Sequence, residues 1–285
     1  MNPILEVTEL RKQIGSFSLQ NVSFSLQEGC ITGLVGINGA GKTTTLKAIL
    51  GLAEADAGRI ALFGKDMDGH ERELKNRIGI VMDEGYFYED LTLREMKSIV
   101  APAYSKWDES AFKQYMTRFS LDPGQKISTL SKGMRMKYAL ALALSHQAEL
   151  LIMDEPTSGL DPLVRSELMD ILLDFMNSGG KAVFFSTHIT SDLDKVADAL
   201  IFMDKGKIKF MEERDALLDS HAVVKGDRAA LNEETRGLFL SVDETHYGFT
   251  GLTNNKMAVR QNMNNVLIER PTIEDVMLGY LKGAK

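Results

Sequence analysis

The stretch Gly36-Ile37-Asn38-Gly39-Ala40-Gly41-Lys42-Thr43 lies between an apolar run at residues 31–35 and a helical pattern at residues 43–50. A glycine-rich turn between a buried strand and a helix is the context that a phosphate-binding loop requires. Glycines let successive backbone N–H groups turn toward an anion, and the start of the helix adds a favourable dipole. The stretch therefore predicts a site for nucleotide phosphates, in preference to an ordinary turn with a solvated lysine.

The polar and glycine positions of this loop are the first candidate ligand contacts. Lys42 would bring a positive charge to the outer phosphates, during binding and catalysis, and Thr43 would bring a hydroxyl to Mg²⁺. ATP and Mg²⁺ are therefore the expected cofactors. The candidate contacts are Gly36, Asn38, Gly39, Ala40, Gly41, Lys42, Thr43 and Thr44.

Two adjacent carboxylates, Asp154 and Glu155, follow a second buried run, Leu150-Leu151-Ile152-Met153. Such a run predicts a buried strand, and α/β sheets bind ligands at the carboxyl ends of their strands. Asp154 could hold Mg²⁺ through water, and Glu155 is the candidate general base for the attacking water. Alone, the pattern is typical of a strand that reaches solvent, but beside a phosphate loop it favours nucleotide hydrolysis.

Short apolar runs alternate with helical patterns along most of the chain, which predicts a largely parallel sheet covered by helices. Near-alternating apolar residues from Phe17 to Leu26, and a run at 59–63 bounded by glycines, favour antiparallel strands beside it. The predicted fold is α/β, with a parallel core and an antiparallel side sheet. The other runs and helical patterns lie at residues 31–35, 43–50, 78–82, 150–153, 163–176, 182–185 and 200–203.

The pattern of apolar and polar residues changes in two places along the chain. Strand patterns are missing between Asp83 and His146, so we expect a helical subdomain inserted at about residues 85–149, with a capping box at Thr92-Leu93-Arg94-Glu95. After about Arg214, short strand-like runs precede a helix that starts near Pro271. We therefore expect a main domain at residues 1–215 and a small α+β segment at residues 216–285. The helical patterns lie at 108–119 and 131–146, and the late strand-like runs at 222–225, 238–242 and 266–269.

Length and composition limit the class of protein. The 285 residues, 44% hydrophobic and 26% charged, suit one large globular domain with a small appendage. The formal charge of −7 argues against a broad basic surface for duplex nucleic acid. A single cysteine, Cys30, excludes an intramolecular disulfide, favours a reducing compartment and is expected in a strand core. The sequence contains no stretch of about 18 apolar residues, so no membrane span is predicted.

Two further segments carry polar residues beside predicted elements. Leu130-Ser131-Lys132-Gly133-Met134 starts a helix, with Ser131 a candidate cap and Gly133 a place where a ligand could approach the backbone. A buried run at 182–185 continues into Ser186, Thr187 and His188, which puts His188 within reach of a γ-phosphate. Each segment alone is typical of an ordinary helix start or strand end.

Together, the segments GINGAGKTT, LSKGM, LLIMDEPTSGLDP and FFSTH, in this order, closely resemble the ATP-binding cassette (ABC) family over about residues 4–215. SKGM and the tail RPTIEDVML are similar to ATPase subunits of bacterial transporters whose membrane protein is a separate chain, especially exporters of antibiotics, peptides and lipids. The resemblance implies a cytoplasmic subunit, peripheral on the inner face of the cell membrane, with a multi-span permease as its partner.

The resemblance also implies how a complete site would form. Ser131, Gly133 and Met134 would contact the γ-phosphate of ATP held by a second ATPase subunit, identical or paralogous, so that two subunits enclose two ATP molecules. Residues 158–161, Ser-Gly-Leu-Asp, match the loop that crosses this dimer interface. His188 matches the switch histidine that senses the γ-phosphate.

The sequence departs from the family pattern at two sites. After residues 78–82 the family has Gln or Glu, whereas here Asp83 aligns best, with Glu84 as the alternative. The resemblance assigns Asp83 to the Mg²⁺ and water shell, although its side chain is shorter. The aromatic residue that stacks on adenine is displaced, because Ile14 occupies the aligned place and Phe17 lies nearby, as a base contact or as core packing.

Three readings of the function follow. In the leading one, ATP closes a dimer and the movement passes to a permease through residues 83–105, where Tyr86-Phe87-Tyr88 form either core or an exposed docking patch. A soluble ABC ATPase acting on ribosomes or DNA is disfavoured by the acidic charge and the lack of a long charged coiled-coil insertion, so no nucleic acid partner is expected. A regulatory or immunity subunit with slow turnover is disfavoured because Glu155 and His188 are both present.

Overall fold

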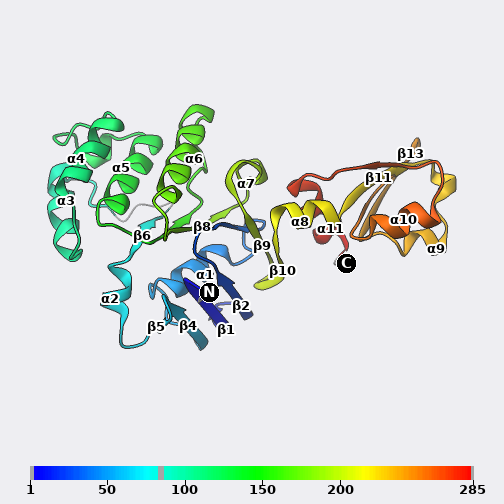
Figure 1. The fold of residues 1–285 in the computed structure, drawn as a ribbon, viewed down its shortest axis with the longest axis horizontal. Coiled ribbons are helices and arrows are strands. Elements are labelled where there is room, and N and C mark those ends of the chain that lie inside the picture. Colours follow the sequence, from blue (N-terminus) through cyan, green and yellow to red (C-terminus); the bar gives the residue numbers. More distant parts are fainter. Residues whose placement is uncertain (1–2, 83–86, 284–285) are drawn as a thin grey trace.

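A six-stranded sheet organises the computed structural model, which describes residues 3–82 and 87–283 (Figure 1). Its strand order is β10-β9-β3-β8-β7-β6, with all neighbouring pairs parallel except β10 against β9. Apart from β10, the strands are almost continuously apolar because both faces of the sheet are covered. Their bounds are Ile31–Val35 (β3), Ile78–Val81 (β6), Leu150–Asp154 (β7), Ala182–Thr187 (β8), Ala199–Asp204 (β9) and Lys207–Glu213 (β10).

One face of this sheet packs on helix α1 (Lys42–Ile49) and on an antiparallel sheet. Leu34, Ile152 and Phe184 point into this core, and the ring of Phe184 lies 5.4 Å from that of Phe24. The predicted mixed fold is confirmed. The antiparallel strands, in sheet order, are β2 (Phe17–Leu26), β1 (Leu5–Ile14), β4 (Ala57–Leu62) and β5 (Lys65–Asp66).

The opposite face packs on helices, three of which gather at one end of the molecule (Figure 1). The predicted capping box is present, since Thr92 accepts a hydrogen bond from the Glu95 N–H and Glu95 caps Thr92 in return. Asp108 and Ser131 cap the next two long helices. The helices on this face are α3 (Leu93–Val100), α4 (Glu109–Arg118), α5 (Lys132–Leu144), α6 (Pro162–Met176) and α7 (Thr190–Val196), with short 3₁₀ turns at Ala101–Ala103 and Ile127–Thr129. Helix α2 (Glu71–Lys75) instead contributes Leu74 to the core on the first face.

The C-terminal residues form a separate antiparallel sheet at the other end of the molecule, in the order β12-β13-β11-β14 (Figure 1). Helix α11 joins it to the larger core, because Val276 and Met277 pack in the same apolar cluster as Leu193 of α7, and Tyr280 contacts the rings of Phe202 and Phe210. The elements are α8 (Arg214–Ser220), β11 (Ala222–Gly226), a 3₁₀ turn (Arg228–Ala230), α9 (Glu233–Arg236), β12 (Ser241–Thr245), β13 (Gly248–Thr253), α10 (Lys256–Asn262), β14 (Leu267–Glu269) and α11 (Ile273–Gly283).

Two expectations about local structure are wrong. The strand predicted at 238–242 forms at Ser241–Thr245, because Leu238 and Phe239 pack under the sheet instead of pairing in it. Cys30 precedes β3 and is partly exposed, so it is not a strand-core residue.

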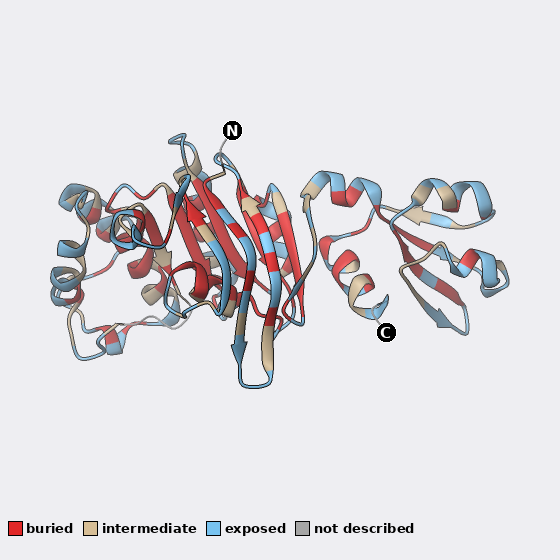
Figure 2. Cartoon of the chain, turned by 90° about the horizontal axis from the view of Figure 1, so that it is seen from below, coloured by how far each residue is buried: buried red, intermediate tan, exposed pale blue. Residues whose placement is uncertain are grey.

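Buried residues concentrate on the strands, and exposed residues on the outer helices and the loops (Figure 2). Within the described ranges, the structure contains no helix of the length and apolarity that a bilayer span requires.

Candidate functional site

The phosphate loop lies between β3 and α1, at the carboxyl end of the parallel strands. Two glycines are required there for different reasons. A side chain at Gly36 would place its Cβ 2.3 Å from the backbone oxygen of Met203, and Gly41 has a φ of 111°, which side chains rarely adopt. Ile37, Asn38 and Gly39, between them, are exposed to solvent. The loop therefore presents backbone groups to solvent over the start of a helix, which is an arrangement that suits phosphate oxygens.

Lys42 is folded back into this loop. Its Nζ donates to the Gly36 oxygen at 2.8 Å and the Ile37 oxygen at 3.3 Å, and it lies 3.1 Å from Glu155 Oε1. The Lys42 side chain is only 5% exposed and that of Glu155 13% exposed, so the pair is largely shielded from water. The cation proposed for the outer phosphates and the proposed general base are thus in direct contact.

Thr43 and Asp154 lie together although 111 residues separate them in the chain. The Thr43 hydroxyl donates to Asp154 Oδ1 at 3.2 Å. Burial raises the pKa of the Asp154 carboxyl, and the hydrogen bonds from Ser186 and Thr43 oppose that shift. A hydroxyl and a carboxylate at one point are the hard oxygen ligands that Mg²⁺ takes beside phosphates, so these residues fit the ion.

His188 follows β8 and reaches the carboxylate of Glu155. Its ring Nδ1 lies 2.7 Å from Glu155 Oε2, and its backbone N–H donates to that oxygen at 3.3 Å. The side chain is 39% exposed, so the imidazole is partly accessible to an incoming ligand. Ser186, two residues earlier, was not among the predicted site residues. The signal that identifies it is the parallel pairing of β7 with β8, which sets Ser186 opposite Asp154.

The remaining predicted contacts lie apart from this cluster or beside it. Ser131 caps α5 by accepting from the Met134 N–H at 3.2 Å, and Gly133 faces Val164 of α6. No hydrogen bond among the described residues joins Ser131, Gly133 or Met134 to the phosphate loop.

The two candidates for the adenine contact differ in position. Phe17 is partly buried, and its Cζ would lie 2.8 Å from a Cβ at Gly41, so its ring lies against the phosphate loop. Ile14 is 50% exposed at the end of β1. Of the two, Phe17 is the one in contact with the loop.

Asp83, Glu84 and Tyr86 lie outside the described residues. The two aromatic residues that follow them have different environments. Phe87 packs against the buried Tyr138, with ring centroids 5.3 Å apart, whereas Tyr88 is 64% exposed. Core packing therefore applies to Phe87, and Tyr88 is available on the surface.

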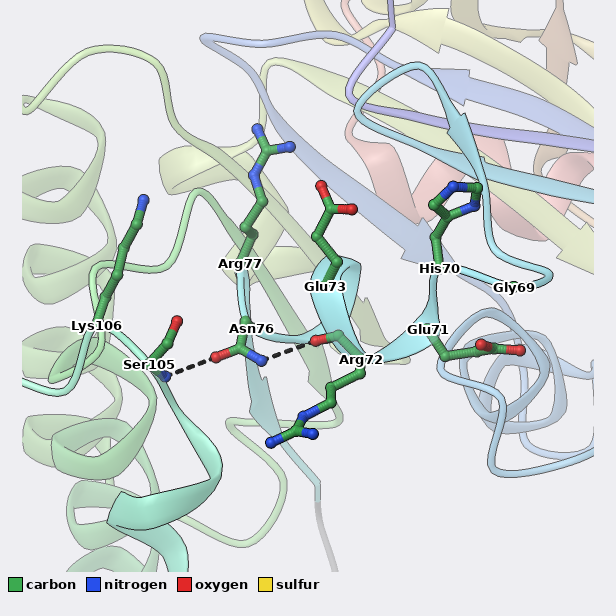
Figure 3. A pocket seen from close by; sticks show the side chains of 9 residues that line it. All are labelled: Gly69, His70, Glu71, Arg72, Glu73, Asn76, Arg77, Ser105 and Lys106. Carbon is green, nitrogen blue, oxygen red and sulfur yellow. Dashed lines mark hydrogen bonds between the residues drawn. The ribbon is translucent and has the colours of Figure 1, made fainter.

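A separate cavity of about 680 Å³ lies between α2 and the loop that joins the 3₁₀ turn at Ala101–Ala103 to α4 (Figure 3). Asn76 spans it, accepting from the Ser105 N–H at 2.8 Å and donating to the Arg72 oxygen at 2.8 Å. Arg72, Arg77 and Lys106 give the wall a basic character that Glu71 and Glu73 partly offset. The lining residues are Gly69, His70, Glu71, Arg72, Glu73, Asn76, Arg77, Ser105 and Lys106.

Comparison with known proteins agrees with this geometry. Residues 19–158 match the family described as ABC transporter. The bacitracin transport ATP-binding protein BcrA of Bacillus licheniformis is 33% identical over 211 residues, covering 73% of this chain and 69% of that protein. The Nod factor export ATP-binding protein I of Ralstonia nicotianae is 34% identical, covering 72% and 65%. A solved ATP-binding subunit of an ABC transporter superimposes with a TM-score of 0.69 at 28% identity, over 76% of this chain and 92% of that one.

Proposed function

Because this chain belongs to the ABC transporter family as an ATP-hydrolysing subunit, we propose that it drives export of an antibiotic, peptide or lipid-like cargo through a separate membrane permease. The observation that carries the proposal is the meeting of Lys42, Thr43, Asp154 and Glu155 at one edge of the parallel sheet. The export direction and the cargo class are supported by the relatives, whose names refer to bacitracin transport and Nod factor export.

In the proposed reaction, each residue of the cluster has one task. Lys42 leaves Glu155 and pairs with the outer phosphates, while the loop's backbone N–H groups orient them. Thr43 and Asp154 would hold Mg²⁺, which neutralises phosphate charge when bound. Glu155, released from Lys42, takes a proton from the attacking water, and His188 keeps its carboxylate oriented through the 2.7 Å contact.

We further propose that two ATPase subunits complete each site. Ser131 lies at the exposed start of α5, where its hydroxyl and the helix N-terminus can face a phosphate on another subunit. Leu163, the second residue of α6, is 79% exposed and suits an intersubunit contact. Closing two subunits on two ATP molecules would then provide the movement that a transporter uses.

The domain organisation that we propose follows from this role. Residues 1–215 would form the ATP-binding domain, with the helical subdomain inserted at about 85–149, and residues 216–285 an accessory segment. The segment 83–105 and the cavity that includes Ser105 and Lys106 would receive a cytoplasmic part of the permease, which would place the chain on the cytoplasmic face of the membrane. Exposure of Tyr88, within this segment, supports such a docking surface.

Purification of the tagged chain from solubilised membranes tests the proposal. We expect a multi-span membrane protein to co-purify, and its recovery to fall for Lys106→Glu. Lys113→Glu is the matched control, since Lys113 is an exposed lysine of α4 outside the cavity. Recovery of ribosomes or DNA with no membrane protein would contradict a transport function.

A further inference from the structure

Ser186 is a fully buried serine that connects the two carboxylate residues of the site. It lies in β8, directly opposite Asp154 of β7 in the parallel pairing. Its hydroxyl donates to Asp154 Oδ1 at 2.5 Å and accepts from the Glu155 N–H at 3.0 Å. Because a hydroxyl has one donor hydrogen and two acceptor positions, it can make both bonds at once.

Glu155 needs such support because its backbone is unusual. Its φ is 47°, in the left-handed region that a side-chain-bearing residue rarely occupies. Its N–H is shared between the backbone oxygen of Ser186 at 3.2 Å and the Ser186 hydroxyl. Both acceptors for this N–H therefore belong to Ser186, and the hydroxyl is the closer one.

We propose that Ser186 is a positioning residue for ATP hydrolysis, whose hydroxyl fixes the metal-holding Asp154 relative to the base-bearing backbone of Glu155. The proposal rests on the roles proposed above for Asp154 and Glu155. Ser186 touches neither ATP nor water in this scheme and acts through its two neighbours.

Its importance increases when the site is loaded. In the present structure Asp154 Oδ1 accepts two hydroxyl hydrogen bonds, from Thr43 and from Ser186. Thr43 is also the residue that would turn its hydroxyl oxygen to Mg²⁺, and Ser186 would then be the remaining hydroxyl that orients the carboxylate. A hydroxyl that only stabilises the fold would have the same effect with and without Mg²⁺. A change in the Mg²⁺ requirement of hydrolysis therefore distinguishes a positioning role of Ser186 from a purely structural one.

The test uses Ser186→Ala, which removes one oxygen and leaves the backbone acceptor for Glu155. We expect kcat to fall about tenfold and the Mg²⁺ concentration for half-maximal activity to rise at least about threefold, while ATP affinity measured with EDTA stays within about twofold. Ser186→Cys, which fills the same space with a poor hydrogen-bond donor, should behave alike and decides the question if the alanine variant does not fold.

Ser145→Ala is the matched control, because Ser145 is equally buried and its hydroxyl donates to the Ala141 oxygen at 2.5 Å, away from the site. It should lower the melting temperature without changing kcat or the Mg²⁺ requirement. Folded Ser186 variants with wild-type kcat and Mg²⁺ dependence would overturn the proposal. Unchanged turnover in Asp154→Asn and Glu155→Gln would contradict the proposed hydrolysis site itself. Loss of turnover in those two variants, with wild-type behaviour of the Ser186 variants, would contradict only the positioning role of Ser186.

Discussion

The contact between Lys42 and Glu155 predicts that Glu155→Gln has two opposite effects. At 3.1 Å and an effective dielectric constant of about 20, the Coulomb attraction is about 5 kcal/mol, most of which desolvation of the pair offsets. Replacing the carboxylate by an amide frees Lys42 for the phosphates and removes a negative charge that repels them. We expect a net gain of about 1–2 kcal/mol in ATP binding, which is an affinity about 5–30 times tighter. Turnover should fall at least about 10²-fold, because the base is lost.

Equilibrium ATP binding and steady-state hydrolysis on the same preparation measure both effects. Glu149→Gln is the matched control, since Glu149 pairs with Arg77 at 2.5 Å just before β7, at the opposite end of that strand from Glu155. That variant loses the same charge and an ion pair, and should leave both quantities unchanged. Wild-type ATP affinity in Glu155→Gln would show that the ion pair does not restrain Lys42. Wild-type turnover would refute the assignment of the base.

Two further predictions concern stability. His146 is fully buried and stacks on Tyr104, with ring centroids 3.8 Å apart. Neither of its ring nitrogens has a hydrogen-bond partner among the described residues. Burial lowers the pKa of His146 to about 4. Because the unfolded chain takes up the proton first, stability should fall as pH decreases from about 6.5 to about 4, by up to about 3 kcal/mol. Urea unfolding should show a smaller fall in His146→Phe, and an identical fall would exclude His146 as its source. Truncation after Arg214 removes Tyr280 and the apolar residues of α11, which pack on the larger core. Calorimetry should therefore show a lower melting temperature, while ATP binding persists. Loss of ATP binding in a folded truncated protein would contradict the peripheral role of this segment.

The sequence predicts the central strands well because their pattern is simple. The runs at 31–35 and 150–153 are continuously apolar, and the structure buries every residue of β3 and β7. The strand β10 went unrecognised because four of its seven residues, Lys207, Lys209, Glu212 and Glu213, are charged and none of the seven is fully buried. The strand β12 begins at Ser241 and not at Leu238, because Leu238 and Phe239 pack against the C-terminal core instead of pairing in the sheet.

The site is predictable from the sequence as a set of segments but not as a set of contacts. Each of Lys42, Thr43, Asp154 and Glu155 stands out by its place after an apolar run or inside a glycine-rich turn. That Lys42 pairs with Glu155 depends on how the side chains at the start of α1 and after the end of β7 are oriented, which spacing does not encode. Ser186 was inconspicuous for the same reason, because its significance comes from the register of β8 against β7.

Equilibrium binding of ATP to Lys42→Ala tests whether this loop is the nucleotide site. The Lys42 ammonium group is the buried cation at the phosphate loop, and its removal leaves the glycine-rich backbone in place. We expect ATP affinity to fall at least about tenfold, with some residual binding, and hydrolysis to be abolished. A folded Lys42→Ala protein that binds ATP as tightly as the wild type would contradict the assignment of this loop as the nucleotide site.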